Sequence, residues 1–257
     1  MKSPFLPVER SRRSPALAVA IAGLATLAHA GVRASDVCSA KSARAVAPVV
    51  ELYTSEGCNS CPPADRWLSR LKADPTVVAL AFHVDYWDRL GWKDRFASAA
   101  FTERQATQQA SNGARFSYTP QVVVDGRDRT DWSSIGTPNA VRAAPVELAL
   151  ARSGEHVTAT VVAGATAPKR LAAYWAVTEL DHVTAVKAGE NQGATLHHDF
   201  VVRDYRPVAA WVAKPDATQT LIFELPRTSD PAHARLVNLV VVDAETGRPV
   251  QALKMGC

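Results

Sequence analysis

Apolar side chains fall in short runs whose spacing predicts alternating strands and helices over the first half of the chain. Residues 46–53 form a nearly continuous run rich in valine and interrupted by Glu51, as expected for a strand buried on both faces. Residues 62–72 carry an apolar stripe at helical spacing and predict a helix. Residues 77–84 predict a second buried strand.

The alternation continues toward residue 152. Residues 85–95 are aromatic and charged without a clean period, which indicates an ordered loop. Residues 98–112 are rich in alanine and glutamine and end at a glycine, which predicts a second helix. A strand at 121–124 leads into a hairpin turn at 125–126, and residues 138–152 are interpreted as a third helix.

From residue 154 onward the pattern changes to short β-type runs separated by Gly, Pro, Asp and Asn. These runs are residues 156–162, 171–178, 200–205, 221–225 and 236–242. The sequence therefore predicts two regions that differ in their pattern of secondary structure. An α/β region at 46–152 contains a mixed sheet flanked by helices with right-handed crossovers, and a smaller β-rich, sandwich-like region follows at 154–257.

The distribution of charged residues along the chain bears on whether a nucleic-acid partner is expected. The chain has 257 residues, 47% of them apolar and 21% charged, and a net charge of +4. The first 34 residues hold five basic side chains against Glu9 alone, so the remainder is neutral. A neutral remainder gives no reason to expect a nucleic-acid partner.

The N-terminal segment has the pattern of a secretory signal peptide at residues 1–34. Arginines precede an apolar run at 16–28, and small residues allow cleavage after Ala30 or Ala34. The run is shorter than the roughly 20 residues that a membrane-spanning helix needs. We expect a periplasmic or secreted protein with no stable membrane span after cleavage; the alternatives are a retained anchor or a disordered tail.

Four cysteines follow this segment: Cys38, Cys58, Cys61 and Cys257. They allow three pairings, and an oxidising compartment favours disulfides. Cys58 and Cys61 are close enough in sequence to pair with each other. Because the termini of compact folds often lie close together, we expect a structural Cys38–Cys257 disulfide, with two free thiols as the alternative.

The Cys58-x-x-Cys61 motif at a strand-to-helix junction predicts thiol–disulfide exchange. The N-terminal end of a helix stabilises a thiolate, so Cys58 is the candidate nucleophile and Cys61 the resolving thiol. Pro62 and Pro63 suit only a first helical turn, so the helix begins nearer Cys61 than Cys58. Glu56 adds a negative charge that opposes thiolate formation.

Other interpretations of the motif stay open. The disulfide can be structural, within a non-catalytic binding module, or the pair can be half of a zinc site in a metal-delivery protein. Zinc needs four ligands, and the sequence has no second C-x-x-C or C-x-x-H pair. We predict no cofactor and no resident metal, no particular oligomeric state, and protein or small-molecule thiols and disulfides as partners.

The segment VVELYTSEGCNSC resembles the opening of glutaredoxins and thioredoxins, and Thr119-Pro120 resembles the cis-proline loop of that fold. Together, CNSCPPAD, FHVDYWDRLGWKDRF and YTPQVVVDG resemble a family of secreted thioredoxin-like proteins labelled as a domain of unknown function. The resemblance runs from about Val49 to near the C-terminus. It implies a thioredoxin-like core and a substrate-binding role for Thr119 and Pro120.

Two positions depart from better-known members of that superfamily. Asn59 and Ser60 replace the Gly-Pro, Pro-His or Pro-Tyr pairs between their cysteines, and Gly57 stands where thioredoxins carry tryptophan. Because the inner pair tunes the redox potential, these departures leave open whether the protein oxidises, reduces or isomerises disulfides.

The second predicted strand ends in further candidates, His83, Asp85, Tyr86 and Trp87, and Trp92 follows in the loop. Asp85 is a candidate acceptor for the proton of Cys61, and either tryptophan is a candidate apolar floor for a peptide. The alternative is that these side chains only pack in the core.

Two other groups of polar residues have both a functional and a structural interpretation. Glu51 is a candidate buried base, or else faces solvent or a hydrogen-bonding partner. His182, His197, His198 and Asp199 form a possible metal cluster, or else a surface turn.

Overall fold

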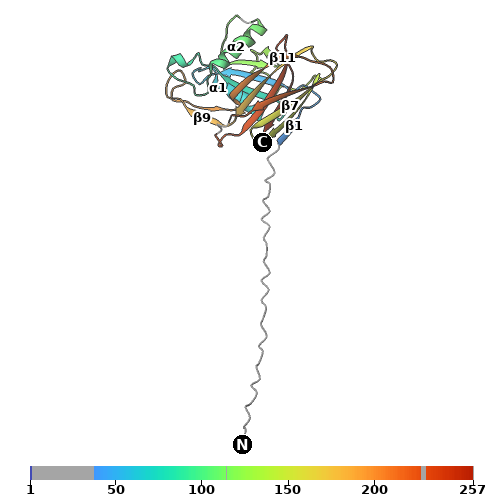
Figure 1. Ribbon diagram of the computed structural model, residues 1–257. Helices are drawn as coiled ribbons and strands as arrows, with labels where there is room; N and C mark the ends of the chain where they lie inside the picture. The colour runs from blue at the N-terminus through green and yellow to red at the C-terminus, as the bar shows by residue number, and fades with distance from the viewer. Residues whose placement is uncertain (2–37, 114, 227–229, 257) are drawn as a thin grey trace. The chain divides into compact units, whose positions relative to one another are not determined.

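A computed structural model describes residues 1, 38–113, 115–226 and 230–256 (Figure 1). The predicted signal-peptide features of residues 2–34 and the side chain of Cys257 lie outside the described residues. The chain divides into Met1–Arg33 and Ala34–Cys257, and the fold described below is that of the second unit.

Strands dominate this unit. The helices are α1 (Pro62–Ser69) and α2 (Ala99–Asn112), with short 3-10 segments η1 (Arg70–Ala73) and η2 (Asp88–Leu90). The strands are β1 (Cys38–Lys41), β2 (Val49–Thr54), β3 (Val78–His83), β4 (Gln121–Val124), β5 (Arg127–Asp128), β6 (Val146–Ser153), β7 (His156–Ala163), β8 (Arg170–Glu179), β9 (His182–Ala185), β10 (Thr195–His198), β11 (Val201–Val212), β12 (Thr218–Glu224), β13 (Arg235–Asp243) and β14 (Pro249–Gly256).

Three sheets organise these strands. The largest has eight strands in the order β14-β13-β8-β11-β3-β2-β4-β5, and the others have the orders β1-β6-β7-β12 and β10-β9. Only β2–β3 and β11–β3 pair in parallel among the described strands. Both large sheets take strands from before and after residue 154, so the two sequence regions share their sheets.

The helices cover only one part of the large sheet, on opposite faces. Val50 and Leu52 of β2 pack in one core cluster with Leu68 of α1, whereas Tyr53 of β2 packs in another with Phe101 of α2. This follows from the period of two along a strand, which sends neighbouring side chains to opposite faces. β2 is therefore buried along its whole length.

The four-stranded sheet covers another part of the large sheet. Alternate residues of β6 and β7 share a core with β8, β12 and β13, in which the rings of Trp175 and Phe223 stack with centroids 5.2 Å apart. In Figure 1, β1 and β7 lie on one side of the Ala34–Cys257 unit and the two helices on the other.

The predicted thioredoxin-like α/β fold is wrong. A helix-flanked sheet needs helices along both faces, but the described residues contain only two α-helices, both beside the β2–β4 part. The same sheet continues through β11, β8, β13 and β14, and a second sheet covers it there. The protein is mostly β, with large mixed sheets.

The predicted helix at 138–152 is also wrong, because residues 146–153 form β6. In this strand the buried Val146, Leu148 and Leu150 alternate with more exposed neighbours. That is the period of a half-buried strand, and burial in the inter-sheet core outweighs the helix preference of the alanines. The predicted helices at 62–72 and 98–112 are present as α1, continued by η1, and α2. The strand at 121–124 and the five β-type runs after residue 154 are also confirmed.

Glu51 is neither a free base nor solvent-facing. It forms an ion pair with Arg104 of α2 and accepts hydrogen bonds from Tyr53 (2.8 Å) and Tyr174 (2.5 Å). The Arg104 guanidinium also donates to the Tyr205 hydroxyl at 2.8 Å and lies 4.1 Å from the centre of the Tyr174 ring. The pair thus joins α2 to β2, β8 and β11.

The predicted disulfide between Cys38 and Cys257 stays a prediction. Cys38 Sγ lies 3.8 Å from the carbonyl oxygen of Gly256, the residue before Cys257. The two ends of this unit therefore lie side by side, while the predicted Cys38–Cys257 disulfide involves a residue outside the described part. No helix among the described residues is long and apolar enough to cross a membrane.

We expect Arg104→Met to lower the free energy of unfolding by about 3–5 kcal/mol, because the Glu51 carboxylate stays buried without its cation. Urea unfolding followed by circular dichroism measures the loss. The control is Arg129→Met, which removes a surface ion pair with Asp131 and leaves the midpoint unchanged. Equal losses in the two variants would contradict the assigned role of Arg104.

Candidate functional site

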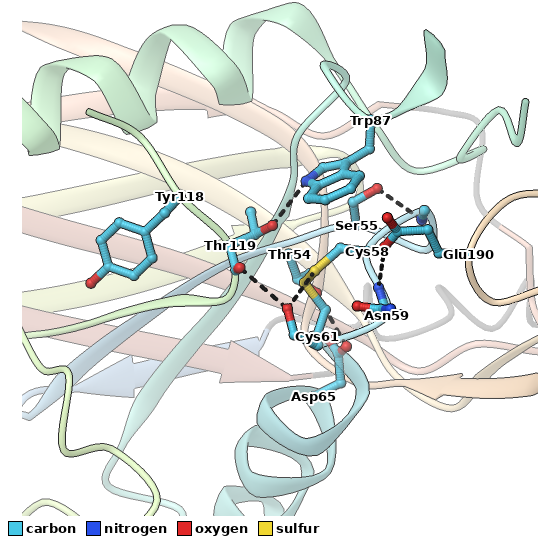
Figure 2. Close-up of a disulfide and its surroundings, with 12 residues drawn as sticks. Thr54, Ser55, Cys58, Asn59, Cys61, Asp65, Trp87, Tyr118, Thr119 and Glu190 are labelled. Atoms are coloured by element: carbon cyan, nitrogen blue, oxygen red, sulfur yellow. Dashed lines mark hydrogen bonds between the residues drawn. A yellow bond between two sulfur atoms is a disulfide. The ribbon is translucent and has the colours of Figure 1, made fainter. Parts of the chain in front are cut away.

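Cys58 and Cys61 form a disulfide directly after β2, with their Cα atoms 5.5 Å apart (Figure 2). The loop that carries them is held by short-range backbone contacts. The Gly57 N–H donates to Ser55 Oγ at 3.0 Å, and the Cys58 and Cys61 N–H groups donate to the carbonyls of Ser55 and Cys58. The predicted position of the pair between a buried strand and a helix is confirmed.

The helix begins just after the second cysteine, as Pro62 and Pro63 indicate. Cys61 is its N-cap and has no side-chain cap hydrogen bond. The two prolines have no N–H, and the N–H groups of Ala64 and Asp65 both donate to the Cys61 carbonyl. The first turn therefore offers no free backbone donor to a thiolate at Cys58, and the helix contributes little to thiolate stability.

Both cysteines are fully buried, with 0% of each residue exposed. Ser60, which is exposed, contributes to the cover: its hydroxyl lies 3.3 Å from Cys58 Sγ and donates to the Thr119 carbonyl at 3.5 Å. An incoming thiolate reaches Cys58 only if such covering groups move.

Two predicted site residues lie beside the disulfide. The Thr119–Pro120 peptide bond is cis, as the resemblance implied. The indole N–H of Trp87 donates to Thr119 Oγ1 at 2.9 Å, which fixes both side chains next to the motif (Figure 2). A Cβ atom at Gly57 would lie 3.0 Å from Trp87 Cβ. A side chain at Gly57 would therefore require Trp87 to shift by a few tenths of an ångström.

The Asp85 carboxylate is bonded to α2. Its Oδ1 accepts a hydrogen bond from Thr102 Oγ1 of α2 at 2.6 Å, and its N–H contacts the same hydroxyl. Trp92 bonds instead to Glu56, through its indole N–H at 2.8 Å.

A second segment, residues 186–194 between β9 and β10, binds the cysteine loop from the other side. The Asn191 side-chain amide donates to the carbonyls of Glu56 (2.9 Å) and Cys58 (3.0 Å), and Glu190 accepts from the Asn59 N–H at 3.1 Å. Sequence reasoning missed this contact, because nothing local in this glycine-containing turn indicates its partner more than 120 residues earlier.

A charged cluster lies buried behind the loop, and we define it as Glu56, Asp65 and His198. His198 Nε2 is 3.5 Å from Glu56 Oε1, and His198 Nδ1 is 3.7 Å from Asp65 Oδ1. The residues are 0%, 5% and 2% exposed, so water does not screen these charges. Asp65 is held in addition by Thr54 Oγ1, which donates to its Oδ2 at 3.1 Å (Figure 2).

Burial alone would lower the pKa of His198, but the carboxylates of Asp65 and Glu56 outweigh it and raise the pKa to about 10. Burial would likewise raise the pKa of Glu56, yet the nearby His198 and Thr184 side chains and the hydrogen bond from Trp92 lower it. At neutral pH, His198 is thus a buried imidazolium between carboxylates.

His83 belongs to a separate buried pair. Its Nδ1 lies 2.7 Å from Asp94 Oδ2, and the same oxygen accepts the Glu56 N–H at 2.9 Å. Burial would raise the pKa of Asp94, but His83 and the N–H groups of Glu56 and Phe96 lower it to about 2. His83 is thus a core histidine with a carboxylate partner.

The possible metal cluster of the β-rich region is not assembled. His197 is exposed, His182 contacts Glu179 at 3.0 Å, and Asp199 pairs with Lys72 at 2.9 Å. Within the described part of the chain, no group of three or more His, Cys, Asp or Glu side chains is arranged to hold a metal ion.

We expect Asn191→Ala to increase the rate at which dithiothreitol reduces Cys58–Cys61, because the cysteine loop loses two hydrogen bonds that hold it closed. The gain is about tenfold if the two bonds contribute about 1.4 kcal/mol to closure. Asn112→Ala is the matched control, since its amide also bonds a backbone carbonyl, in α2. Equal reduction rates in the two variants would show that the 186–194 segment does not limit access.

A family description matches residues 49–242: protein of unknown function (DUF1223). Among solved structures, protein AGR_C_4864 from Agrobacterium tumefaciens is 27% identical with a TM-score of 0.62, covering 83% of this chain and 95% of that one. HBP35 of Porphyromonas gingivalis is 16% identical with a TM-score of 0.58, covering 83% and 76%, and shows similarity of fold alone. No curated protein matches. Because the matched region spans most of its 257 residues, the chain belongs to the DUF1223 family.

Proposed function

We propose that the protein carries out thiol–disulfide exchange through Cys58 and Cys61, on disulfides or thiols of proteins or small molecules. One observation carries the proposal. The disulfide joins residues close in sequence, in a loop whose backbone is already fixed by hydrogen bonds, so the loop does not need the disulfide to keep its conformation. Asn191, Glu190 and Ser55 fix the loop backbone by hydrogen bonds. A bridge across a sequence separation of three adds about 2 kcal/mol of chain-entropy stabilisation, less than a long-range one.

The surroundings of the disulfide support the same function. Buried charges cost folding free energy, and charged groups with shifted pKa values gather at functional sites. Here two such groups, Glu56 and His198, lie against the cysteine loop, and the buried Asp65 of α1 contacts His198.

Cys58 is the proposed nucleophile and Cys61 the resolving thiol. Cys58 Sγ lies next to the exposed Ser60, whose hydroxyl can donate to a thiolate there in place of the helix N–H groups. Cys61 is the N-cap of α1. Thr119 and Trp87 are proposed to contact the incoming chain, and the predicted leader places the proposed reaction in the periplasm or outside the cell.

The second candidate function is a binding module in which the disulfide is structural. Complete burial of both cysteines is the observation that favours it.

The test is the Cys61→Ser variant incubated with glutathione disulfide. We expect a stable mixed disulfide at Cys58, visible by intact mass and reversed by dithiothreitol, because the resolving thiol is missing. Cys58→Ser is the control and should form little adduct. If Cys61→Ser keeps its circular dichroism spectrum but forms no adduct, the structural interpretation is correct.

A further inference from the structure

A cleft of about 550 Å³ lies beside Phe96, and three arginines line it: Arg95, Arg203 and Arg235. Its described lining includes no residue of the cysteine loop or of the cis-proline loop, so it is separate from the disulfide site. We call it the arginine cleft. The exchange reaction proposed above gives this cleft no role.

The large sheet brings two of these arginines to the same end of β8. Arg235 begins β13 and pairs in register with Glu179, the last residue of β8. β11 pairs with β8 on the other side, and the register shifts between Val202 and Asp204, which makes Arg203 the extra residue of a β-bulge. A bulge redirects a side chain, and bulges are frequent next to active sites.

Two of the guanidinium groups are held against the Phe96 ring. The Cζ atoms of Arg95 and Arg203 lie 4.6 and 5.1 Å from its centre. Arg95 also donates to the Val183 carbonyl at 3.3 Å, and Arg203 Nε lies 3.2 Å from Glu179 Oε2. A guanidinium has five N–H donors, so each group keeps donors for a further partner while its position is already fixed.

The acidic side chains of the cleft do not balance its arginines. Three arginines against Glu179 and Asp230 leave one positive charge. Glu179 is shared, because its Oε2 also lies 3.0 Å from His182 Nε2, and the Asp230 side chain is 62% exposed. Among the ion pairs of the described residues, Arg203 is the one cleft arginine with a carboxylate partner.

His182 adds no positive charge to the cleft at neutral pH. Burial lowers its pKa to about 4, and the neighbouring His233, whose ring centre is 3.6 Å away, adds to this effect. The permanent positive charge of the cleft therefore lies on the arginines, which stay protonated in proteins.

We propose that the arginine cleft binds a small oxyanion ligand, a carboxylate or a phosphate ester, through Arg95, Arg203 and Arg235. Two parallel N–H donors of a guanidinium fit two oxygens of either group. A bound anion also offsets the excess positive charge of the lining. The volume of the cleft lies within the range of small-molecule sites, so an organic ligand fits around the charged group.

A metal ion does not suit the same cleft. His182, His233, Glu179 and Asp230 all line it. In the part of the chain that the structure describes, however, no three such side chains are arranged to hold a metal ion. The arginines would in addition repel a cation.

Calorimetric titration of the full chain with inorganic phosphate and with citrate tests the proposal. We expect the wild type to bind at least one probe, and the tighter probe identifies the ligand class as phosphate esters or organic acids. Arg95→Gln and Arg235→Gln should each weaken binding about tenfold, because each removes charge-assisted hydrogen bonds. Arg203 is left intact, since its loss would leave the buried Glu179 without its cation.

The matched control is Arg89→Gln, which removes the same charge from an exposed residue of η2 outside the cleft. This variant should keep the wild-type affinity. Equal weakening in Arg89→Gln and the cleft variants would show nonspecific attraction to net charge and overturn the inference. Binding of neither probe by the wild type would overturn it as well.

A second measurement needs no variant to fold. In the wild type, addition of the tighter probe should shift the side-chain Nε–H resonances of Arg95, Arg203 and Arg235 and leave that of Arg89 unchanged. Shifts of equal size at Arg89 would contradict binding in the cleft. The reduced and oxidised forms of Cys58–Cys61 are not involved, so failure here leaves the proposed exchange untouched.

Discussion

Buried carboxylates along one continuous segment, from β2 through the cysteine loop to α1, have to be neutralised by groups from elsewhere in the chain. Glu51 is matched by Arg104 of α2, and Glu56 and Asp65 are matched by His198 of β10. An unpaired charge at such a site costs several kcal/mol. The positions of α2 and β10 around β2 are therefore fixed by charge as well as by apolar packing.

The need to neutralise these buried carboxylates also determines how the site is built. His198 reaches the cysteine loop only because β9 and β10 form a hairpin that packs on α1, and the turn of that hairpin brings Asn191 onto the Cys58 carbonyl. The cation of the charged cluster, His198, and the side chain that holds the cysteine loop, Asn191, thus come from one hairpin. A movement of this hairpin would expose Cys58 and disturb the ion pairs of His198 together.

Local features of the site were predictable from the sequence, because they depend on neighbouring residues. The strand before Cys58 and the late start of the helix imposed by Pro62 and Pro63 have local signals, and both are present. The cis bond before Pro120 is also present, but it was expected from the resemblance of Thr119-Pro120 to a cis-proline loop. Partners far apart in sequence were not predictable. Nothing in the pattern pairs Glu51 with Arg104, or Asn191 with the cysteine loop.

The predicted fold class was wrong for a related reason. The alternation at 146–153 fits a strand, but its alanines also suit a helix, and only the facing sheet decides between them. The sequence likewise contains no signal that β2 and β3 belong to the same sheet as β8 and β13. Charge and burial identified candidate residues such as Glu51 and His198, but their roles depend on partners that tertiary structure supplies.

The reduction potential of the Cys58–Cys61 disulfide decides whether the pair exchanges with thiols or is purely structural. Equilibration of the full chain with defined ratios of reduced and oxidised dithiothreitol or glutathione, read by intact mass after alkylation, gives the value. We predict a potential between about −120 and −270 mV, as in catalytic pairs. A potential below about −300 mV, as in structural disulfides, would contradict it.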